Sequence, residues 1–572
     1  MPSAPAQDSP GENAWLPPSL GPKEVRGGTT SPAHAVEERH PLASLGHGSV
    51  VTLIGQVVMV GALFGTRVLL VTSLNAQFYG DLALGLAITG LLSSLGSLGL
   101  PSAVARQLAH TTDVSERWRI VVHSLTLAAP AAALTGTIVF FAAPELALWF
   151  QGTPVVYQFL AVNLSLGLIS GVVTSFFQGN EDAFPNMLFN QILNPVLTIG
   201  FLMLLLARAA SIESALMAYV VAGLLTLVGA TAYTVSPFGF PWKRGELASK
   251  GQSLDPKAST LLALLAFSLP LMLVGLSTAA VGTVDTIVLG ALRGPAPVAA
   301  YNAVLPLARL VALAVTALGY IMLPVTARLH RLGDMPELGR SYATITKWVM
   351  LISLPFFLLF FLLPAASLTF VYRAGFLATP GYGSAPLLLQ VTCLGSFAFT
   401  IAGPSTAVLI GLGKLRLLVV NTFVSAGADA GLSLALVPFW GSLGAAVAFA
   451  IATALLPVLC TIQIYLLTGI HPFSGPRLRP LVVVTAPTVV ILGLLTWWVH
   501  WVPSNLELVG LFFVLFAAYL FAVLLTRSLE AGDHHLLRVV EGYLGRELTF
   551  VRRFGRRFVP TPEDAPAASG RT

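Results

Sequence analysis

The stretch LNAQFYGDLALGLAITGLLSSLGSLGLPSAVARQLA, from Leu74 to Ala109, contains one long apolar run that ends close to a basic residue. Its ending, PSAVAR with Arg106, is matched by PVTAR with Arg328, 222 residues further along the chain. A second pair at a similar offset is Asn190 and Asn421, which lie 231 residues apart. The chain therefore contains two related halves. Paired half-bundles that rock around a shared site are the architecture of alternating-access carriers.

The composition is that of a membrane protein. Charged residues make up 10% of the chain and apolar residues 55%, with a mean hydropathy of +0.82, whereas soluble domains have about 25% charged residues. Each of about fourteen apolar runs could cross about 30 Å of hydrocarbon as a helix. We predict an all-α membrane protein of two pseudo-symmetric six-helix lobes and two further helices. The expected spans are 49–72, 82–103, 118–143, 155–178, 185–207, 212–235, 261–290, 295–323, 348–370, 384–409, 415–438, 443–467, 481–502 and 507–526.

The polar stretches between these runs give the expected organisation. It comprises a disordered cytoplasmic tail (1–45), an N-lobe (46–235), a cytoplasmic linker (236–258), a C-lobe (259–468), two helices (469–527) and a basic cytoplasmic segment (528–572). The tail lacks the basic start and apolar run of a signal peptide. The last segment contains LTFVRRFGRRFV, which is typical of a helix lying on the inner membrane surface, although a plain basic tail is the alternative.

The distribution of lysine and arginine predicts the orientation. With both termini in the cytoplasm, only Arg208, Arg293 and Arg373 fall in outer loops, and Arg67 and Arg309 fall within spans. The others lie on the inner side, as the positive-inside rule requires. We therefore predict a multi-pass protein of the cytoplasmic (inner) membrane. Its net charge of +6 indicates contact with anionic membrane lipids, and no nucleic-acid partner is expected.

Three stretches resemble polysaccharide exporters. The Leu74–Ala109 stretch resembles the end of their first helix and their second helix. LPLMLVGLSTAAVGTVDTIVLGALRG (Leu269–Gly294) resembles their seventh helix, and LVPFWGSLGAAVAFAIAT (Leu436–Thr453) resembles the turn between helices eleven and twelve. Over about residues 45–530 the chain is similar to the multidrug/oligosaccharidyl-lipid/polysaccharide (MOP) flippase superfamily and its Wzx-like polysaccharide transporter branch. The resemblance implies a MATE-like pair of lobes around a central cavity. It also implies flipping of polyprenyl-diphosphate-linked oligosaccharides across the inner membrane.

Arg67 and Arg309 are the candidate ligands of such a substrate. An arginine near the centre of a membrane span costs at least a few kcal/mol, so it normally faces a cavity or a partner. Guanidinium binds phosphate oxygens through a planar fork. Two arginines from opposite lobes that face one cavity would hold a diphosphate between them. The alternative is that each arginine pairs with an acid inside the membrane and fixes a helix contact.

Three acids in the spans are candidates for gating, or for coupling to a proton or sodium ion. Asp285 lies near the outer end of the seventh expected helix. It could pair with Arg293 or Arg309 and close an outer gate, or simply cap its helix. Asp429 lies near the centre of the eleventh helix among small residues, and we expect it to face the cavity. Asp81, at the start of the second helix, is a further candidate.

A stripe of asparagines gives two more candidate substrate-binding residues, Asn190 and Asn421. Asn186, Asn190 and Asn194 are four residues apart, so they share one face of a helix. Such a stripe either donates hydrogen bonds to sugar hydroxyls or holds helices together. The matching position of Asn421 in the other half favours a helix contact.

The sequence shows no nucleotide-binding loop, Ser-His-Asp set or metal-spaced histidine cluster, and Cys393 and Cys460 lie within apolar spans. We therefore expect no enzyme activity, cofactor, metal or disulfide. The leading interpretation is a flippase, with a glycan polymerase as a candidate partner. One alternative is a cation-coupled multidrug antiporter, which usually has an acid in the first helix. Others are a lipid II flippase and, from a different class, a non-transporting subunit or polymerase of a glycan assembly complex.

Overall fold

The computed structural model describes residues 39–111, 114–180, 183–235, 258–473, 475–498 and 502–526. The 1–38 part of the tail, the 236–257 part of the linker and the basic C-terminal segment lie outside the described residues. Contacts divide the chain into Met1–Gly46 and His47–Thr572, and the description that follows concerns the second unit.

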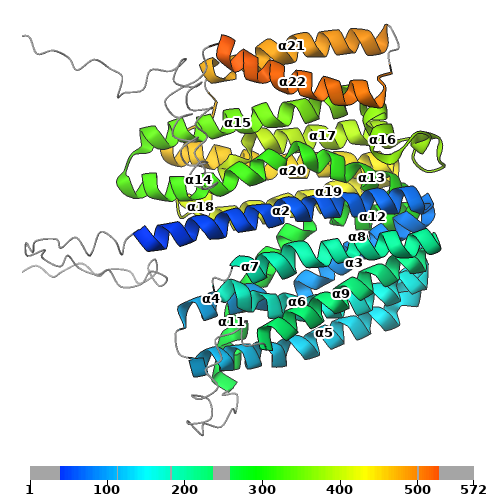
Figure 1. The fold of residues 1–572 in the computed structure, drawn as a ribbon, viewed down its shortest axis with the longest axis vertical. Coiled ribbons are helices and arrows are strands. Elements are labelled where there is room, and N and C mark those ends of the chain that lie inside the picture. Colours follow the sequence, from blue (N-terminus) through cyan, green and yellow to red (C-terminus); the bar gives the residue numbers. More distant parts are fainter. Residues whose placement is uncertain are drawn as a thin grey trace, which may run out of the picture. The chain divides into compact units, whose positions relative to one another are not determined.

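All regular elements in the described residues are helices, which confirms the predicted all-α class. The helices of the first half are α2 (Arg39–Ser73), α3 (Ala76–Gly96), α4 (Leu100–His110), α5 (Val114–Phe150), α6 (Pro154–Gly179), α7 (Ala183–Asn186), the π-helix η1 (Met187–Leu193), α8 (Asn194–Arg208) and α9 (Ile212–Val235). Those of the second half are α11 (Ala258–Ala280), α12 (Val284–Arg293), α13 (Pro295–Val311), α14 (Leu313–Leu332), α15 (Met335–Leu362), α16 (Pro364–Tyr372), the 3₁₀ helix η2 (Phe376–Ala378), α17 (Ala385–Ala402), α18 (Pro404–Gly411), α19 (Leu415–Trp440) and α20 (Ser442–Thr468). Two helices follow, α21 (Gly475–Trp497) and α22 (Asn505–Leu525), and both pack against α15 (Figure 1).

The protein is a multi-pass membrane protein. In the described residues, 12 helices are long and apolar enough to cross a membrane, and the bent pair α11–α12 would make up to 13. The eighth expected span, 295–323, is occupied by α13 and the start of α14, which meet at Ala312. Cys393 and Cys460 are free cysteines. Both are buried, as their apolar surroundings predicted.

The two halves repeat the same pairwise packing. In the first half α6 packs against α5, α9, α3 and α4. In the second half α17 packs against α15, α20 and α13, and its continuation α18 packs against α14. The last two helices of each half, α8 with α9 and α19 with α20, also pair. This shared pattern is the structural counterpart of the repeat in the sequence.

The second helix of each half is broken. In the first half the break lies between α3 and α4, where Leu98 and Gly99 have positive φ values of 51° and 69°. In the second half it lies at Ala312, between α13 and α14. A Cβ on Gly99 would collide with the carbonyl oxygen of Ser268 in α11. Glycine is therefore needed here both for its conformation and for the close approach of α11.

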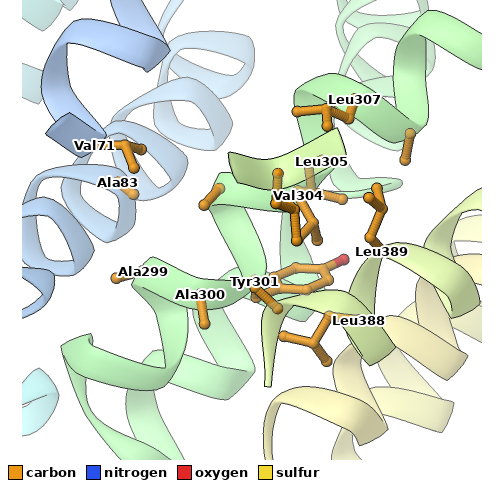
Figure 2. Packing of buried hydrophobic residues seen from close by; sticks show 14 of the residues in the cluster. Val71, Ala83, Ala299, Ala300, Tyr301, Val304, Leu305, Leu307, Leu388 and Leu389 are labelled. Atoms are coloured by element: carbon orange, nitrogen blue, oxygen red, sulfur yellow. The ribbon is translucent and has the colours of Figure 1, made fainter. Parts of the chain in front are cut away.

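The halves meet along α3 and α13. A Cβ on Gly80 would collide with the carbonyl oxygen of Pro295, so the two backbones touch near the start of both helices. Small residues allow such approaches between membrane helices. Behind this contact the ring of Tyr301 on α13 lies beside Leu388 and Leu389 of α17, whereas Ala83 of α3 lies near Val71 of α2 (Figure 2).

The orientation can be tested with cysteines at two exposed positions, Ala210 in the α8–α9 turn and Leu332 at the end of α14. We expect a membrane-impermeant maleimide added to intact cells to label Ala210→Cys but not Leu332→Cys. Lysis should make both positions reactive. Both native cysteines are buried, so background labelling should be low. Labelling of both variants in intact cells would contradict the predicted orientation.

Candidate functional site between the two halves

One cavity contains both membrane arginines. It has a volume of about 160 Å³ and is lined by residues of α2, α3, α12, α13 and the α11–α12 break. The lining residues are Arg67, Ala83, Leu86, Ala87, Gly90, Gly282, Thr283, Thr286, Asn302, Leu305, Pro306 and Arg309. The structure thus brings together the two arginines that the sequence predicted to share a cavity. Their contact with a substrate stays a prediction.

Arg67 reaches the cavity from α2 and is surrounded by tyrosines. Its Nη1 donates a hydrogen bond to the hydroxyl of Tyr79 at 3.4 Å. Its other electrostatic neighbours are Tyr219 of α9 and Tyr372 of α16. Because a phenol is uncharged at neutral pH, these three described neighbours do not neutralise the positive charge of Arg67.

Arg309 reaches the same cavity from α13. It lies deep among protein atoms, keeps exposed surface and lines the cavity. Its guanidinium is repelled by that of Arg67 and attracted by Asp285. Among the described residues, no carboxylate lies at ion-pair distance from either cavity arginine.

Asp285 is completely buried on α12, next to the cavity wall. It accepts hydrogen bonds from the Tyr301 hydroxyl and from the backbone N–H of Thr286. Arg293, one of its two predicted partners, instead donates to the carbonyl oxygen of Pro438. Arg309, the other, attracts Asp285 electrostatically without forming an ion pair in the described structure.

Asp429 lies behind the break between α11 and α12 and does not line the cavity. Its Oδ2 accepts a hydrogen bond from the backbone N–H of Gly282 at 3.0 Å, whereas its Oδ1 is buried with no hydrogen-bond partner in the described residues. The two helices bend by 53° at this point, and Gly282 has a φ of +73°. Asp429 therefore reaches the cavity only through Gly282.

Asp81 is also away from the cavity. It is buried at the start of α3, and its Oδ2 accepts a hydrogen bond from the N–H of Thr153 at 2.6 Å. Gly152 lies directly against its carboxylate. Asp81 thus fastens the start of α3 to the turn between α5 and α6.

Neither candidate asparagine lines the cavity. Asn421 is buried and exchanges two hydrogen bonds of 2.8 Å with Gln463, which join α19 to α20. Asn190 donates to Asn186 at 2.7 Å within its own segment. Asn421 therefore makes a helix contact, whereas Asn190 does not bridge two helices in this structure.

Sequence reasoning missed three cavity features. In the part of the cavity wall that the second half forms, the side chain of Asn302 donates a hydrogen bond of 3.4 Å to the hydroxyl of Thr286. Tyr79 contacts Arg67 from behind the wall. The signal that could have drawn attention to Asn302 is Pro306, four residues later, because a proline leaves the carbonyl four residues earlier without its helical donor.

The comparisons agree with this architecture. Residues 45–330 match the polysaccharide biosynthesis protein family, and residues 270–435 match the MatE family. A search of curated proteins finds no match.

Solved transporters have a similar fold. The inward-facing conformation of a multidrug resistance MATE family transporter of the MOP superfamily aligns with a TM-score of 0.59 and 15% identity, over 74% of this chain and 98% of that one. The lipid II flippase MurJ, in an inward closed conformation, aligns with a TM-score of 0.65 and 11% identity, over 83% and 97%. A MOP superfamily transporter from Pyrococcus furiosus aligns with a TM-score of 0.50 and 16% identity, over 75% and 95%.

At these identities the structures establish the fold, and the family match covers half of the chain. The chain belongs to the polysaccharide biosynthesis protein family, within the multidrug/oligosaccharidyl-lipid/polysaccharide superfamily of membrane transporters and flippases.

Proposed function

We propose that the protein flips polyprenyl-diphosphate-linked oligosaccharides across the cytoplasmic membrane by alternating access, with Arg67 and Arg309 holding the diphosphate. The observation that carries this proposal is the shared cavity. An arginine from each half lines it, and none of its described lining residues is acidic. The two guanidinium groups could bind one multivalent anion from opposite walls of the cavity.

The charge balance supports an anionic substrate. An arginine without a counter-charge within a membrane span is costly, and two like charges repel each other across this cavity. A diphosphate would relieve both penalties, because it brings several negative charges and can accept bidentate hydrogen bonds from each fork. Apolar and small residues from α3 complete the wall, which leaves the arginines as its only charged groups among the described residues.

The size of the cavity supports a carrier that must change shape. Pockets for drug-sized ligands have volumes of roughly 300–1,000 Å³, and this cavity has about 160 Å³. It suits a charged head group and is too small for an attached oligosaccharide. The bend between α11 and α12 and the breaks in the second helix of each half are places where such a protein can flex.

The cavity also bears on the alternatives. A carrier of cationic drugs would need acids where this chain has Arg67 and Arg309. A non-transporting subunit or polymerase would not need an arginine-lined cavity between two matched halves. A lipid II flippase also handles a diphosphate-linked lipid, so it differs from our proposal only in the sugar. Identifying the lipid-linked glycan that accumulates in cells lacking the protein would separate these two.

We propose that the buried acids of the second half couple transport to a proton or sodium ion. Asp285 and Asp429 interact electrostatically with each other, and Arg309 attracts Asp285. Two neighbouring carboxylates repel each other when both are ionised, so a proton or a cation bound between them would be favoured. Asp81 is left out of this proposal, because its hydrogen bond to Thr153 places it at the α5–α6 turn. Both termini are proposed to be cytoplasmic, near anionic lipids, with a glycan polymerase as a candidate partner.

Binding to the purified protein tests the diphosphate directly. We expect undecaprenyl diphosphate to raise the thermal stability, by about 2.7 kcal/mol at 100 times its Kd. Undecaprenyl phosphate should act more weakly, and undecaprenol should have no effect. Arg309→Ala should remove the stabilisation, whereas the matched control Arg208→Ala, at the exposed end of α8, should retain it. Equal stabilisation by undecaprenol, or stabilisation by a cationic dye alone, would contradict the proposal.

A further inference from the structure

Tyr79 lies between a cavity arginine and the opposite half of the protein. Its side chain is completely buried on α3. It accepts the hydrogen bond from Arg67, and its own hydroxyl donates to the carbonyl oxygen of Asn302 on α13 at 3.3 Å. One phenol therefore connects a cavity arginine of the first half to the backbone of the second half.

The carbonyl of Asn302 is available because of Pro306. In a regular helix the carbonyl of Asn302 would accept a hydrogen bond from the N–H of residue 306. Proline has no N–H, so the helix itself leaves this buried carbonyl without a donor. Tyr79 supplies the missing donor from the other half.

This hydrogen bond lies beside a close backbone contact between the halves. The residue after Tyr79 is Gly80, whose backbone touches Pro295 at the start of α13. Further along the same interface, Leu84 lies against Gly290 of α12. These contacts lie at the end of the helices that carries the α2–α3 turn, which is the expected outer side. They must separate for the cavity to open outward.

We propose that Tyr79 is a positioning residue that couples the occupancy of Arg67 to this outer contact. In the empty cavity the guanidinium polarises the phenol and strengthens its bond to Asn302, because hydrogen bonds in a chain reinforce one another. When phosphate oxygens take the N–H groups of Arg67, this support is withdrawn and the α3–α13 contact weakens. Only the identity of the anion rests on the function proposed above.

Spin labels on the outer turns of the two halves test this coupling. Ala210 and Ala378 are both exposed, one in each half, and Ala210→Cys with Ala378→Cys provides the labelled pair. In the purified, ligand-free protein, we expect Tyr79→Phe to increase the population of longer distances about five-fold, the effect of losing one ordinary hydrogen bond. Undecaprenyl diphosphate should produce a similar shift in the parent and little further change in Tyr79→Phe.

Tyr382→Phe is the matched control. Tyr382 is as buried as Tyr79, but its hydroxyl has no hydrogen-bond partner in the described structure. The same chemical change there should leave the distances unaltered. The proposal is overturned if Tyr79→Phe has the distances of the parent, or if both variants lengthen them equally. The ligand-free comparison stands even if undecaprenyl diphosphate does not bind, an outcome that would count only against the proposed substrate.

Pro306→Ala provides a second variant in case Tyr79→Phe does not fold. It restores the N–H of residue 306, which then competes with Tyr79 for the carbonyl of Asn302. We expect longer outer distances in this variant although Tyr79 is intact. Parent-like distances in a folded Pro306→Ala protein would overturn the role assigned to the free carbonyl.

Discussion

Arg309→Ala is expected to abolish glycan export while the protein stays at normal abundance in the membrane. Removing one partner of a buried, hydrogen-bonded charge pair costs about 2–5 kcal/mol of binding, which is roughly 30-fold or more in affinity. The stability of the folded protein should not change, because the side chain faces a cavity and has no ion-pair partner among the described residues. Loss of an arginine from a membrane span favours insertion. Export of the surface glycan and immunoblotting of membranes measure the two quantities.

Arg309→Lys is expected to restore export only partly. Lysine keeps the charge but lacks the planar fork that binds phosphate oxygens in pairs. Arg208→Ala, which removes an exposed arginine at the end of α8, should export normally. If Arg67 and Arg309 hold the same diphosphate, the double alanine variant should be no worse than the more severe single one. Full export by Arg309→Ala at normal abundance would rule out an essential contact.

The membrane architecture could be predicted from sequence because its signal is physical and repeated. Long apolar runs must form helices in a bilayer, since backbone groups there have to be satisfied within the segment. The offset between matched residues such as Arg106 and Arg328 then divided the runs into two halves. The breaks within the apolar runs were harder to predict from the sequence. Ala312 lies in an apolar stretch where hydropathy gives no sign of a break. On either side of it α13 packs mainly against α3 and α17, whereas α14 packs mainly against α18 and α15.

The charged residues of the candidate site could be predicted, because a charge within an apolar span stands out in the sequence. Arg67 and Arg309 stood out because arginine is costly in a span, and the structure places them on one cavity. Asp429 was expected to face that cavity. The bend at Gly282 places backbone between them, and an unusual bend of this kind cannot be read from hydropathy. Nothing in the sequence marked Tyr79 as important, because its role depends on a hydrogen bond to Asn302, which is 223 residues away in the chain.

Asp429→Asn is expected to leave protein abundance normal and to impair export. The amide oxygen of asparagine can still accept the hydrogen bond from the N–H of Gly282, so the bend between α11 and α12 keeps its support. What disappears is the ionisable carboxyl group beside Asp285, and with it the proposed attraction for a coupling cation. Residual export should therefore no longer respond when the proton or sodium gradient is collapsed in everted membrane vesicles.

Asp429→Ala separates the charge from the hydrogen bond. Alanine removes the acceptor as well and leaves the N–H of Gly282 buried without a partner, which costs about 1–3 kcal/mol. We expect this variant to show lower thermal stability than Asp429→Asn, in addition to the export defect. A sharp drop in folded protein for Asp429→Asn itself would assign Asp429 a structural role, since in that case the buried charge, and not the hydrogen bond, would hold the bend together. Asp429→Asn could instead export as fast as the parent and remain gradient-dependent. That result would exclude both roles for this carboxylate and leave Asp285 as the acid of the second half to test.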